Sequence, residues 1–202
     1  MPGTAPAATP ILADGVVLLR APAPADLDRI VTGCQDPQVA MWIPVPVPYG
    51  PADARTWLDL HPADSSWWAN PTWAITVPPS RRWSGSIELR LDDAGGADVG
   101  YLLAPWARGE GLAERALRLA CAFAFGSLGL QVVTWAALVG NDASRRTAQR
   151  VGFDVPDHAF SRWLVHRGDR RDAWLGTLTA EGLSRATRLA DGQRRAASAT
   201  LT

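Results

Sequence analysis

The stretch VGYLLAPWARGEGLAERAL, from Val99 to Leu117, decides the fold of this chain. It predicts a strand over Val99–Leu103, a glycine-rich turn over Arg108–Gly111 and a long helix that begins at Leu112. Backbone N–H groups in such a turn, together with the positive end of the helix, bind anions, and the glycines allow a close approach. The pattern therefore predicts an anion site made from backbone. An ordinary strand-to-helix turn is the alternative.

Two common phosphate-binding motifs do not fit this stretch. A Walker loop needs a lysine after its last glycine, and this chain contains no lysine. A dinucleotide fingerprint needs a third glycine at the position that Glu114 occupies. Anions must therefore be bound by arginine side chains or by backbone N–H groups. The carboxylate of Glu110 is compatible with such a loop if its N–H points inward and its side chain points to solvent.

The composition predicts one globular domain and excludes several classes of function. The chain has 202 residues, of which 47% are hydrophobic and 20% are charged, and its formal net charge is zero. A neutral chain without a basic run argues against a nucleic-acid partner. Cys34 and Cys121 are too few for a zinc site, and no apolar stretch reaches the roughly 20 residues of a membrane span. No signal peptide is evident, so we expect a soluble cytoplasmic protein without a metal and without a membrane partner.

The periodicity of apolar residues predicts alternating strands and helices. Strands are expected over Gly15–Arg20, Thr72–Val77, Ser84–Leu91, Val99–Leu103, Gln131–Leu138, Ala159–Arg167 and Arg171–Leu178. Helices are expected over Ala25–Cys34, Ala52–Leu60, Leu112–Leu128 and Asn141–Val151, with a proline-rich loop over Trp42–Pro51. This order implies a mixed sheet with a crossover on each side of the glycine-rich turn. We expect a disordered N-terminus over residues 1–10, a single domain over 11–180, and a C-terminal extension over 181–202 with a short helix followed by disorder.

A second stretch, VGNDASRRTAQRVGF from Val139 to Phe153, gives the first one a family context. Together the two resemble the GNAT superfamily of acyl-CoA-dependent N-acyltransferases. The pyrophosphate loop of that family follows the pattern R/Q-x-x-G-x-G/A, which Arg108, Gly111 and Ala113 satisfy.

Three further motifs resemble a narrower branch, the RimJ/RimL-type (ribosomal-protein N-terminal) acetyltransferases. They are GYLLAP before the loop, the N-x-x-S of Asn141 and Ser144, and the G-x-R-x-D-x-W of Gly168–Trp174. The resemblance runs from about Val16 to Leu178. It implies the α/β GNAT fold, which is a mostly antiparallel central sheet with a splayed parallel pair and about four flanking helices.

The resemblance also implies where the cofactor, acetyl-CoA, is held. The strand before the loop splays from its neighbour and pairs with the pantetheine arm, and the loop caps the pyrophosphate. Asn141 would hydrogen-bond the pantetheine or the strand end, and Ser144 would lie near the thioester sulfur. The implied cofactor-binding residues are Tyr101, Leu102, Leu103, Arg108, Gly109, Glu110, Gly111, Leu112, Ala113, Asn141 and Ser144.

The implied reaction needs a base for the ammonium, a donor for the carbonyl and a proton for the departing thiolate. A backbone N–H near Leu102 is the predicted carbonyl donor. Many family members carry a tyrosine in the helix before Gly-Phe, where this chain has Ala148, so Ser144 is the next candidate acid. Capping or packing in its own helix is the alternative role for Ser144.

The base is less determined by the sequence. Glu88 and Asp98 are the candidate carboxylates, with a chain of water molecules or a solvated position for either carboxylate as alternatives. Some family members place a glutamate in the strand after Gly-Phe, where this chain has Arg162 and Trp163. The three histidines, His61, His158 and His166, have no nearby partner pattern and are predicted to lie on the surface.

The acceptor site is predicted around the proline-rich loop. Its candidate residues are Trp42, Pro44, Tyr49 and Trp73, an aromatic and proline-stiffened wall that suits a peptide end or an apolar small molecule.

Three functions stay open at this level. The first is acetylation of the α-amine of a protein or peptide. The second is acetylation or succinylation of a small amine such as an antibiotic or metabolite, with succinyl-CoA as the alternative donor. The third is a non-catalytic acyl-CoA-binding module. The resemblance favours a homodimer over a monomer.

Overall fold

A computed structural model describes residues 8–63, 67 and 70–199 of the chain. Within them, one sheet of eight strands has the order β1-β2-β3-β4-β5-β6-β8-β7. The strands are β1 (Leu12–Ala13), β2 (Leu18–Arg20), β3 (Thr72–Thr76), β4 (Trp83–Leu91), β5 (Gly96–Leu103), β6 (Val132–Leu138), β7 (Phe160–His166) and β8 (Asp169–Leu178).

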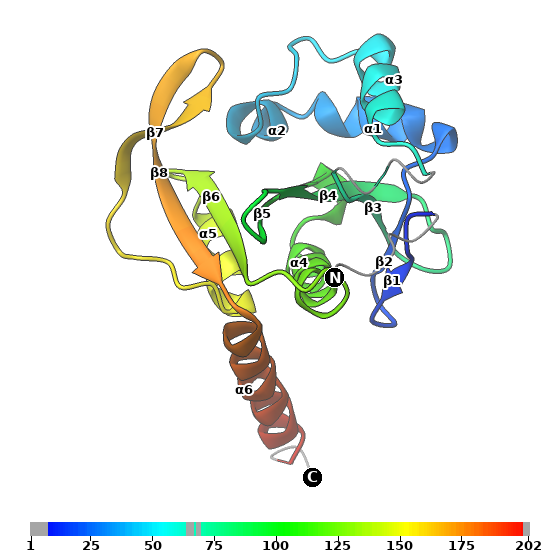
Figure 1. The fold of residues 1–202 in the computed structure, drawn as a ribbon. Helices are drawn as coiled ribbons and strands as arrows, with labels where there is room; N and C mark the ends of the chain where they lie inside the picture. The colour runs from blue at the N-terminus through cyan, green and yellow to red at the C-terminus, as the bar shows by residue number, and fades with distance from the viewer. Residues whose placement is uncertain (1–7, 64–66, 68–69, 200–202) are drawn as a thin grey trace.

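Helices cover both faces of this sheet (Figure 1). Those on one face are α1 (Leu27–Cys34), α2 (Pro37–Trp42) and α3 (Pro51–Leu60), and those on the other are α4 (Leu112–Gly126), α5 (Asp142–Val151) and α6 (Ala180–Ala199). Short 3-10 turns, η1 (Pro24–Asp26) and η3 (Pro105–Ala107), precede α1 and the glycine-rich loop. The described residues thus contain six α-helices where the sequence predicts about four.

The parallel pair of β5 and β6 is short, and the two strands then separate. Their register joins Gly96–Asp98 of β5 to Val132–Thr134 of β6, whereas β5 stays paired with β4 as far as Leu103. Every other pair of neighbouring strands in the described sheet is antiparallel. The predicted mixed sheet with a splayed parallel pair is therefore confirmed.

Helix α4 fixes the position of the glycine-rich loop, because the loop leads directly into it. Its inner face is made mostly of small side chains, which lets the helix lie close to β4 and β5. The buried residues of α4 are Leu112, Ala116, Leu117, Ala120, Cys121, Phe123 and Ala124. Burial of a side chain such as Leu117 contributes about 2 kcal/mol, so the loop begins from a rigid support.

Two helices differ from the sequence prediction. Helix α2 is unexpected, and its first N–H groups are capped by Asp36, whose carboxylate accepts hydrogen bonds from the N–H of Gln38 and of Val39. Helix α6 has 20 residues where a short helix followed by disorder is predicted. Leu183 anchors α6 in the core, and Ala186 lies against Gly152, which explains why this helix continues from the domain.

The N-terminal segment corrects a second expectation. Thr9 donates its N–H to the Ala63 carbonyl at 3.3 Å, and the Pro10 carbonyl accepts a hydrogen bond from the Trp73 indole at 2.9 Å. These two residues are therefore held by the domain, although disorder is predicted for residues 1–10; residues 1–7 and 200–202 lie outside the described part. No helix in the described ranges is long and apolar enough to cross a membrane.

Candidate active site

Two cavities meet where β5 and β6 separate. The first, here called the loop cavity, has a volume of about 370 Å³ and lies against the glycine-rich loop and the starts of α4 and α5. The second, here called the large cavity, has a volume of about 680 Å³ and lies between α1–α3, the β7–β8 hairpin and the strands β4–β6. Six of the described residues line both cavities: Trp42, Ile43, Tyr101, Leu102, Asn141 and Ser144.

The loop itself depends on glycine for its backbone conformation. Gly109 and Gly111 have φ values of 86° and 72°, and a Cβ atom on either would meet no atom within 4 Å. Glycine is therefore required here by the left-handed conformation and not by crowding. Both glycines line the loop cavity, whereas Glu110 is exposed and does not, in keeping with the expected outward direction of its side chain.

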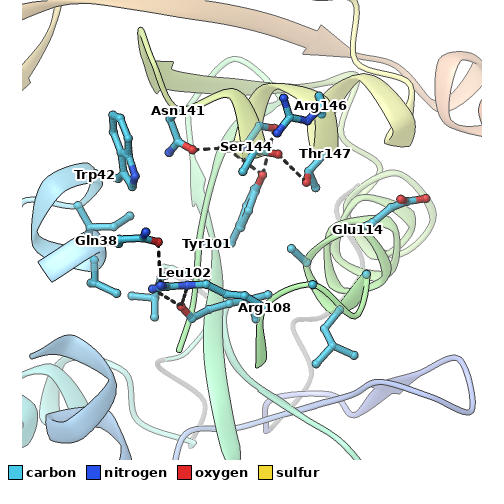
Figure 2. A pocket seen from close by; sticks show the side chains of 18 of the residues that line it. Gln38, Trp42, Tyr101, Leu102, Arg108, Glu114, Asn141, Ser144, Arg146 and Thr147 are labelled. Carbon is cyan, nitrogen blue, oxygen red and sulfur yellow. Dashed lines mark hydrogen bonds between the residues drawn. The ribbon is translucent and has the colours of Figure 1, made fainter. Parts of the chain in front are cut away.

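The side chain of Arg108 joins the loop to α2 (Figure 2). Its guanidinium donates to Gln38 Oε1 at 3.0 Å, to an Asp36 carboxylate oxygen at 3.1 Å and to the Leu103 carbonyl at 3.2 Å. Burial alone would raise the pKa of Asp36, but Arg108 and the capping N–H groups outweigh it and hold that pKa below its ordinary value. The sequence analysis assigns only the backbone of Arg108 to cofactor binding. The contacts that its side chain makes with α2 are a finding of the structure.

Alternation along β5 decides which backbone groups face the gap between β5 and β6. The Ala104 N–H donates to the Ser84 carbonyl, and the register of the same ladder pairs Leu102 with Ser86. In an antiparallel ladder every second residue points its N–H and C=O to the same partner strand, so Leu102 uses its N–H on β4. The groups that face the gap belong to Tyr101 and Leu103, which corrects the expectation of a donor at Leu102.

The hydroxyls of Tyr101 and Ser144 form a pair at the junction of the cavities (Figure 2). Tyr101 Oη and Ser144 Oγ are 2.9 Å apart, and the Trp135 indole N–H donates to Ser144 Oγ at 3.2 Å. Burial raises the pKa of the Tyr101 hydroxyl, so this group keeps its proton at neutral pH. The sequence assigns Tyr101 only as part of the strand, and its hydroxyl at this junction is a feature that sequence reasoning missed.

Asn141 and Ala148 explain why Ser144 is free for this pair. Asn141 Oδ1 accepts the Ser144 N–H at 3.2 Å, so Asn141 caps α5 and the Ser144 hydroxyl does not have to. Ala148, at the position where the resemblance expects a tyrosine, is fully buried in the core. The only hydroxyls of described residues that line both cavities are therefore those of Tyr101 and Ser144.

The two candidate carboxylates have different surroundings. Glu88 lies opposite Gly100 in the β4–β5 ladder and lines the large cavity. It forms an ion pair with Arg90, and His61 Nε2 lies 3.8 Å from its carboxylate. Asp98 also binds Arg90 but lines neither cavity, so the expectation that it faces the cleft is wrong. Arg90 covers it because Asp98 lies directly opposite Arg90 in the ladder.

Two of the three histidines are inside the large cavity, contrary to the surface location predicted for them. The side chain of His61 is only 12% exposed, and its Nδ1 lies 2.7 Å from the Trp57 carbonyl. His166 is only 8% exposed, and burial, together with the charges of Arg167 and Arg171, lowers the pKa of its imidazole. His158 is exposed, as predicted.

The predicted acceptor residues divide in the same way. Trp42, Pro44 and Tyr49 line the large cavity. Trp73 does not: it is fully buried and packs edge-on against Phe123 of α4, with ring centroids 5.5 Å apart. Its prediction as an acceptor residue is wrong, because β3 turns this side chain towards the core on the α4 face.

The large cavity is mainly aromatic and aliphatic with a few charged groups. Beside Tyr49, the thiol of Cys34 is uncharged, because burial raises its pKa to about 11. Of the described residues in its lining, Asp53, Glu88 and Arg90 carry charged side chains, and the last two form an ion pair. Among the described residues, no group of three His, Cys, Asp or Glu side chains is arranged to hold a metal ion.

Fold and site together define an acyltransferase of the mixed α/β class, with a backbone loop for an anion beside a splayed pair of strands. The family model described as "Acetyltransferase (GNAT) domain" matches residues 17–154. The chain belongs to this family of acetyltransferases.

Several solved structures share this fold. Mycobacterium smegmatis RimJ, in complex with CoA-disulfide, has a TM-score of 0.76 at 22% identity and covers 96% of this chain and 97% of its own. A GNAT-family acetyltransferase from Bacillus anthracis has a TM-score of 0.74 at 16% identity, over 85% of this chain and 99% of its own. RimL, a ribosomal α-N-protein acetyltransferase in complex with coenzyme A, has a TM-score of 0.73 at 15% identity, over 86% of this chain and 99% of its own.

Proposed function

We propose that this acetyltransferase transfers an acetyl group from acetyl-CoA to the α-amine of a protein or peptide. The observation that carries the proposal is the meeting of the two cavities at Tyr101 and Ser144, between a backbone anion loop and an aromatic, proline-lined wall. The printed names of RimJ and RimL relatives, one of them an α-N-protein acetyltransferase, support the choice of an α-amine.

The loop cavity fits the phosphates of coenzyme A. Its N–H groups lie at the start of a 15-residue helix, and the glycine positions are open. Arg146 and Arg150 also line this cavity, and Glu114, the one carboxylate that the described residues contribute to its lining, is bound by Arg118 and Arg150. A bound acyl-CoA would supply the thioester carbonyl that the amine attacks.

Residues on the two faces of the sheet then have separate tasks. Leu102, on the same face of β5 as Gly100, packs against α1 and α3, so Glu88, which lies opposite Gly100 in the β4–β5 ladder, belongs to that face. Glu88, with His61 beside it, binds the acceptor ammonium and takes its proton. The backbone N–H of Tyr101, which faces the gap between β5 and β6, donates to the carbonyl oxygen.

The hydroxyl pair serves the leaving thiolate. Tyr101 and Ser144 lie on the face of α4 and α5, and the Trp135 N–H on Ser144 Oγ makes the serine hydroxyl a better donor. A thiol has a pKa of about 8.5, so a modest donor is sufficient. An α-amine, with a pKa of about 8 against about 10.4 for lysine, likewise needs only a weak base, which this cavity offers.

The test is the release of free thiol from acetyl-CoA with a panel of N-terminal peptides and small amines, with the product identified by mass spectrometry. We expect acetylation of peptide α-amines with a higher kcat/KM than that of lysine side chains or aminoglycosides. A preference for small amines, or for succinyl-CoA, would replace the proposal with the small-molecule function. Binding of CoA without thiol release from any acceptor would replace it with a non-catalytic binding module.

A further inference from the structure

His166 is a buried polar side chain in the wall of the large cavity. It ends β7, one residue before the turn into β8, and it is only 8% exposed. Across the described part of the chain, no group is hydrogen-bonded to its ring. His61, the other histidine of this cavity, differs because the Trp57 carbonyl lies 2.7 Å from its ring.

Both ring nitrogens of His166 keep some access to solvent, because neither is one of the buried side-chain atoms that lack a partner in the described residues. A neutral imidazole offers one N–H donor and one acceptor nitrogen. Burial and the neighbouring charges of Arg167 and Arg171 lower the pKa of His166, so the ring is neutral at neutral pH. The cavity therefore presents an unused donor and acceptor with no charge of their own.

Arg167 holds this wall in place. Its guanidinium donates to the Ala40 carbonyl at 3.0 Å and to the Val45 carbonyl at 2.9 Å. These bonds fasten the turn of the β7–β8 hairpin to α2 and to the loop after it, and the hairpin and α2 are neighbours in Figure 1. His166, the residue before Arg167, lines the same cavity as Pro44 and Pro46 of this loop.

The charges of the large cavity give an acceptor a direction. The carboxylate of Glu88 lies on strand β4, whereas Arg167 and Arg171 lie near His166 on the β7–β8 hairpin. An amine is attracted to Glu88, and a second cation is repelled from the hairpin side. A second cation is therefore disfavoured beside His166, and a neutral group that both donates and accepts a hydrogen bond complements the neutral ring.

We propose that His166 is a recognition residue for a peptide group of the acceptor, downstream of the reacting α-amine. One ring nitrogen donates to a peptide carbonyl, and the other accepts from a peptide N–H. The proposal rests on the proposed function and deepens it, because it assigns the substrate class as a peptide chain rather than a simple amine or a polycation.

The experiment compares two acceptors, an Ala-Ala-Ala peptide amide and isopropylamine, which has the branched amine carbon but lacks the peptide group. We expect His166→Leu to lower kcat/KM for the peptide about tenfold or more, mainly through KM, which corresponds to about 1.4 kcal/mol. The kcat/KM for isopropylamine should stay the same. His166→Gln, which keeps a donor and an acceptor, should restore much of the peptide activity, and His158→Leu is the matched control because His158 is exposed and outside the cavity.

Each other outcome overturns the proposal. An equal loss for both acceptors that appears in kcat would show that the ring serves the reaction and not recognition. Unchanged kinetics in His166→Leu would show that the ring only fills the wall. If the wild type acetylates isopropylamine but no peptide, the proposed function itself fails, and that result is visible without any variant. CoA affinity and thermal melting of each variant report whether the fold is intact.

Discussion

The two cavities are built in different ways. One wall of the loop cavity comes from a continuous stretch, Arg108–Ala113, and the start of the helix that follows it, whereas its other walls come from α2, β5 and α5. The large cavity is made of side chains that range along the sequence from Ile30 to His166 and that come from helices, strands and a hairpin turn. A site made of local backbone is defined by glycine spacing, whereas a site made of dispersed side chains is defined only by the completed fold.

The largest expected effect is on the acceptor side. We expect Glu88→Gln to lower kcat/KM about a hundredfold, because general-base catalysis contributes about 10²–10⁴-fold, while CoA affinity stays the same. Steady-state kinetics with a peptide acceptor, together with calorimetry for CoA, would measure both.

Asp98→Asn is the matched control for this change. Both carboxylates bind Arg90, but only Glu88 lines the large cavity. We therefore expect Asp98→Asn to have little effect on turnover. Equal losses in the two variants would mean that the charge on Arg90 matters and that Glu88 is not the base.

A smaller effect is expected on the loop side, in affinity instead of turnover. Gly111→Val places a side chain in the loop cavity at a φ of 72° and should weaken CoA binding about tenfold or more, which is about 1.4 kcal/mol. Gly129→Val is the control, because Gly129 has a φ of 66° and open space but lines neither cavity. It carries the same backbone strain, so calorimetry should show unchanged CoA affinity. A normal affinity in Gly111→Val would contradict the placement of the pyrophosphate.

Most of the loop side was predictable from sequence because glycine spacing and helix start signals are local. The splay of Val99–Leu103 also followed from the family resemblance. The choice between Leu102 and Tyr101 as the donor was not predictable, because it depends on the phase of the β4–β5 ladder and a shift of one residue exchanges them. The Tyr101 hydroxyl was missed for a similar reason, since its partner Ser144 is 43 residues away on α5.

The acceptor side was only partly predictable. The proline-rich loop indicated that Trp42, Pro44 and Tyr49 line the acceptor cavity, and they do. Trp73 was predicted there because it is also aromatic, but it lies in the core. His61 and His166 lie at the ends of a helix and a strand, where sequence gives no sign of burial. Their location follows from how α3 and the β7–β8 hairpin close over the sheet.

The hydroxyl pair lies between the two cavities, so its variants sharpen the comparison. We expect Ser144→Ala and Tyr101→Phe each to lower kcat about five- to tenfold without a change in CoA affinity, because groups that act as a unit each account for most of the joint loss. The double variant should then be little worse than either single one. Additive losses would show two independent roles, and an unchanged kcat in Ser144→Ala would show that this residue is only structural.

The smallest expected effect concerns the ion pair of Asp36 and Arg108, which joins the glycine-rich loop to α2. Asp36→Ala removes the cap of α2 and should lower the free energy of unfolding by about 1 kcal/mol. Asp36→Asn keeps a capping oxygen and should lower it by less, about 0.5 kcal/mol for the lost ion pair.

Because the pKa of folded Asp36 is below its ordinary value of 3.8, this ionic contribution is present above that value and is lost as the pH falls through the folded pKa. The difference between wild type and Asp36→Asn in urea unfolding should therefore disappear in that acid range. A difference that persists at low pH would mean that Asp36 acts through its cap and not through the charge of Arg108.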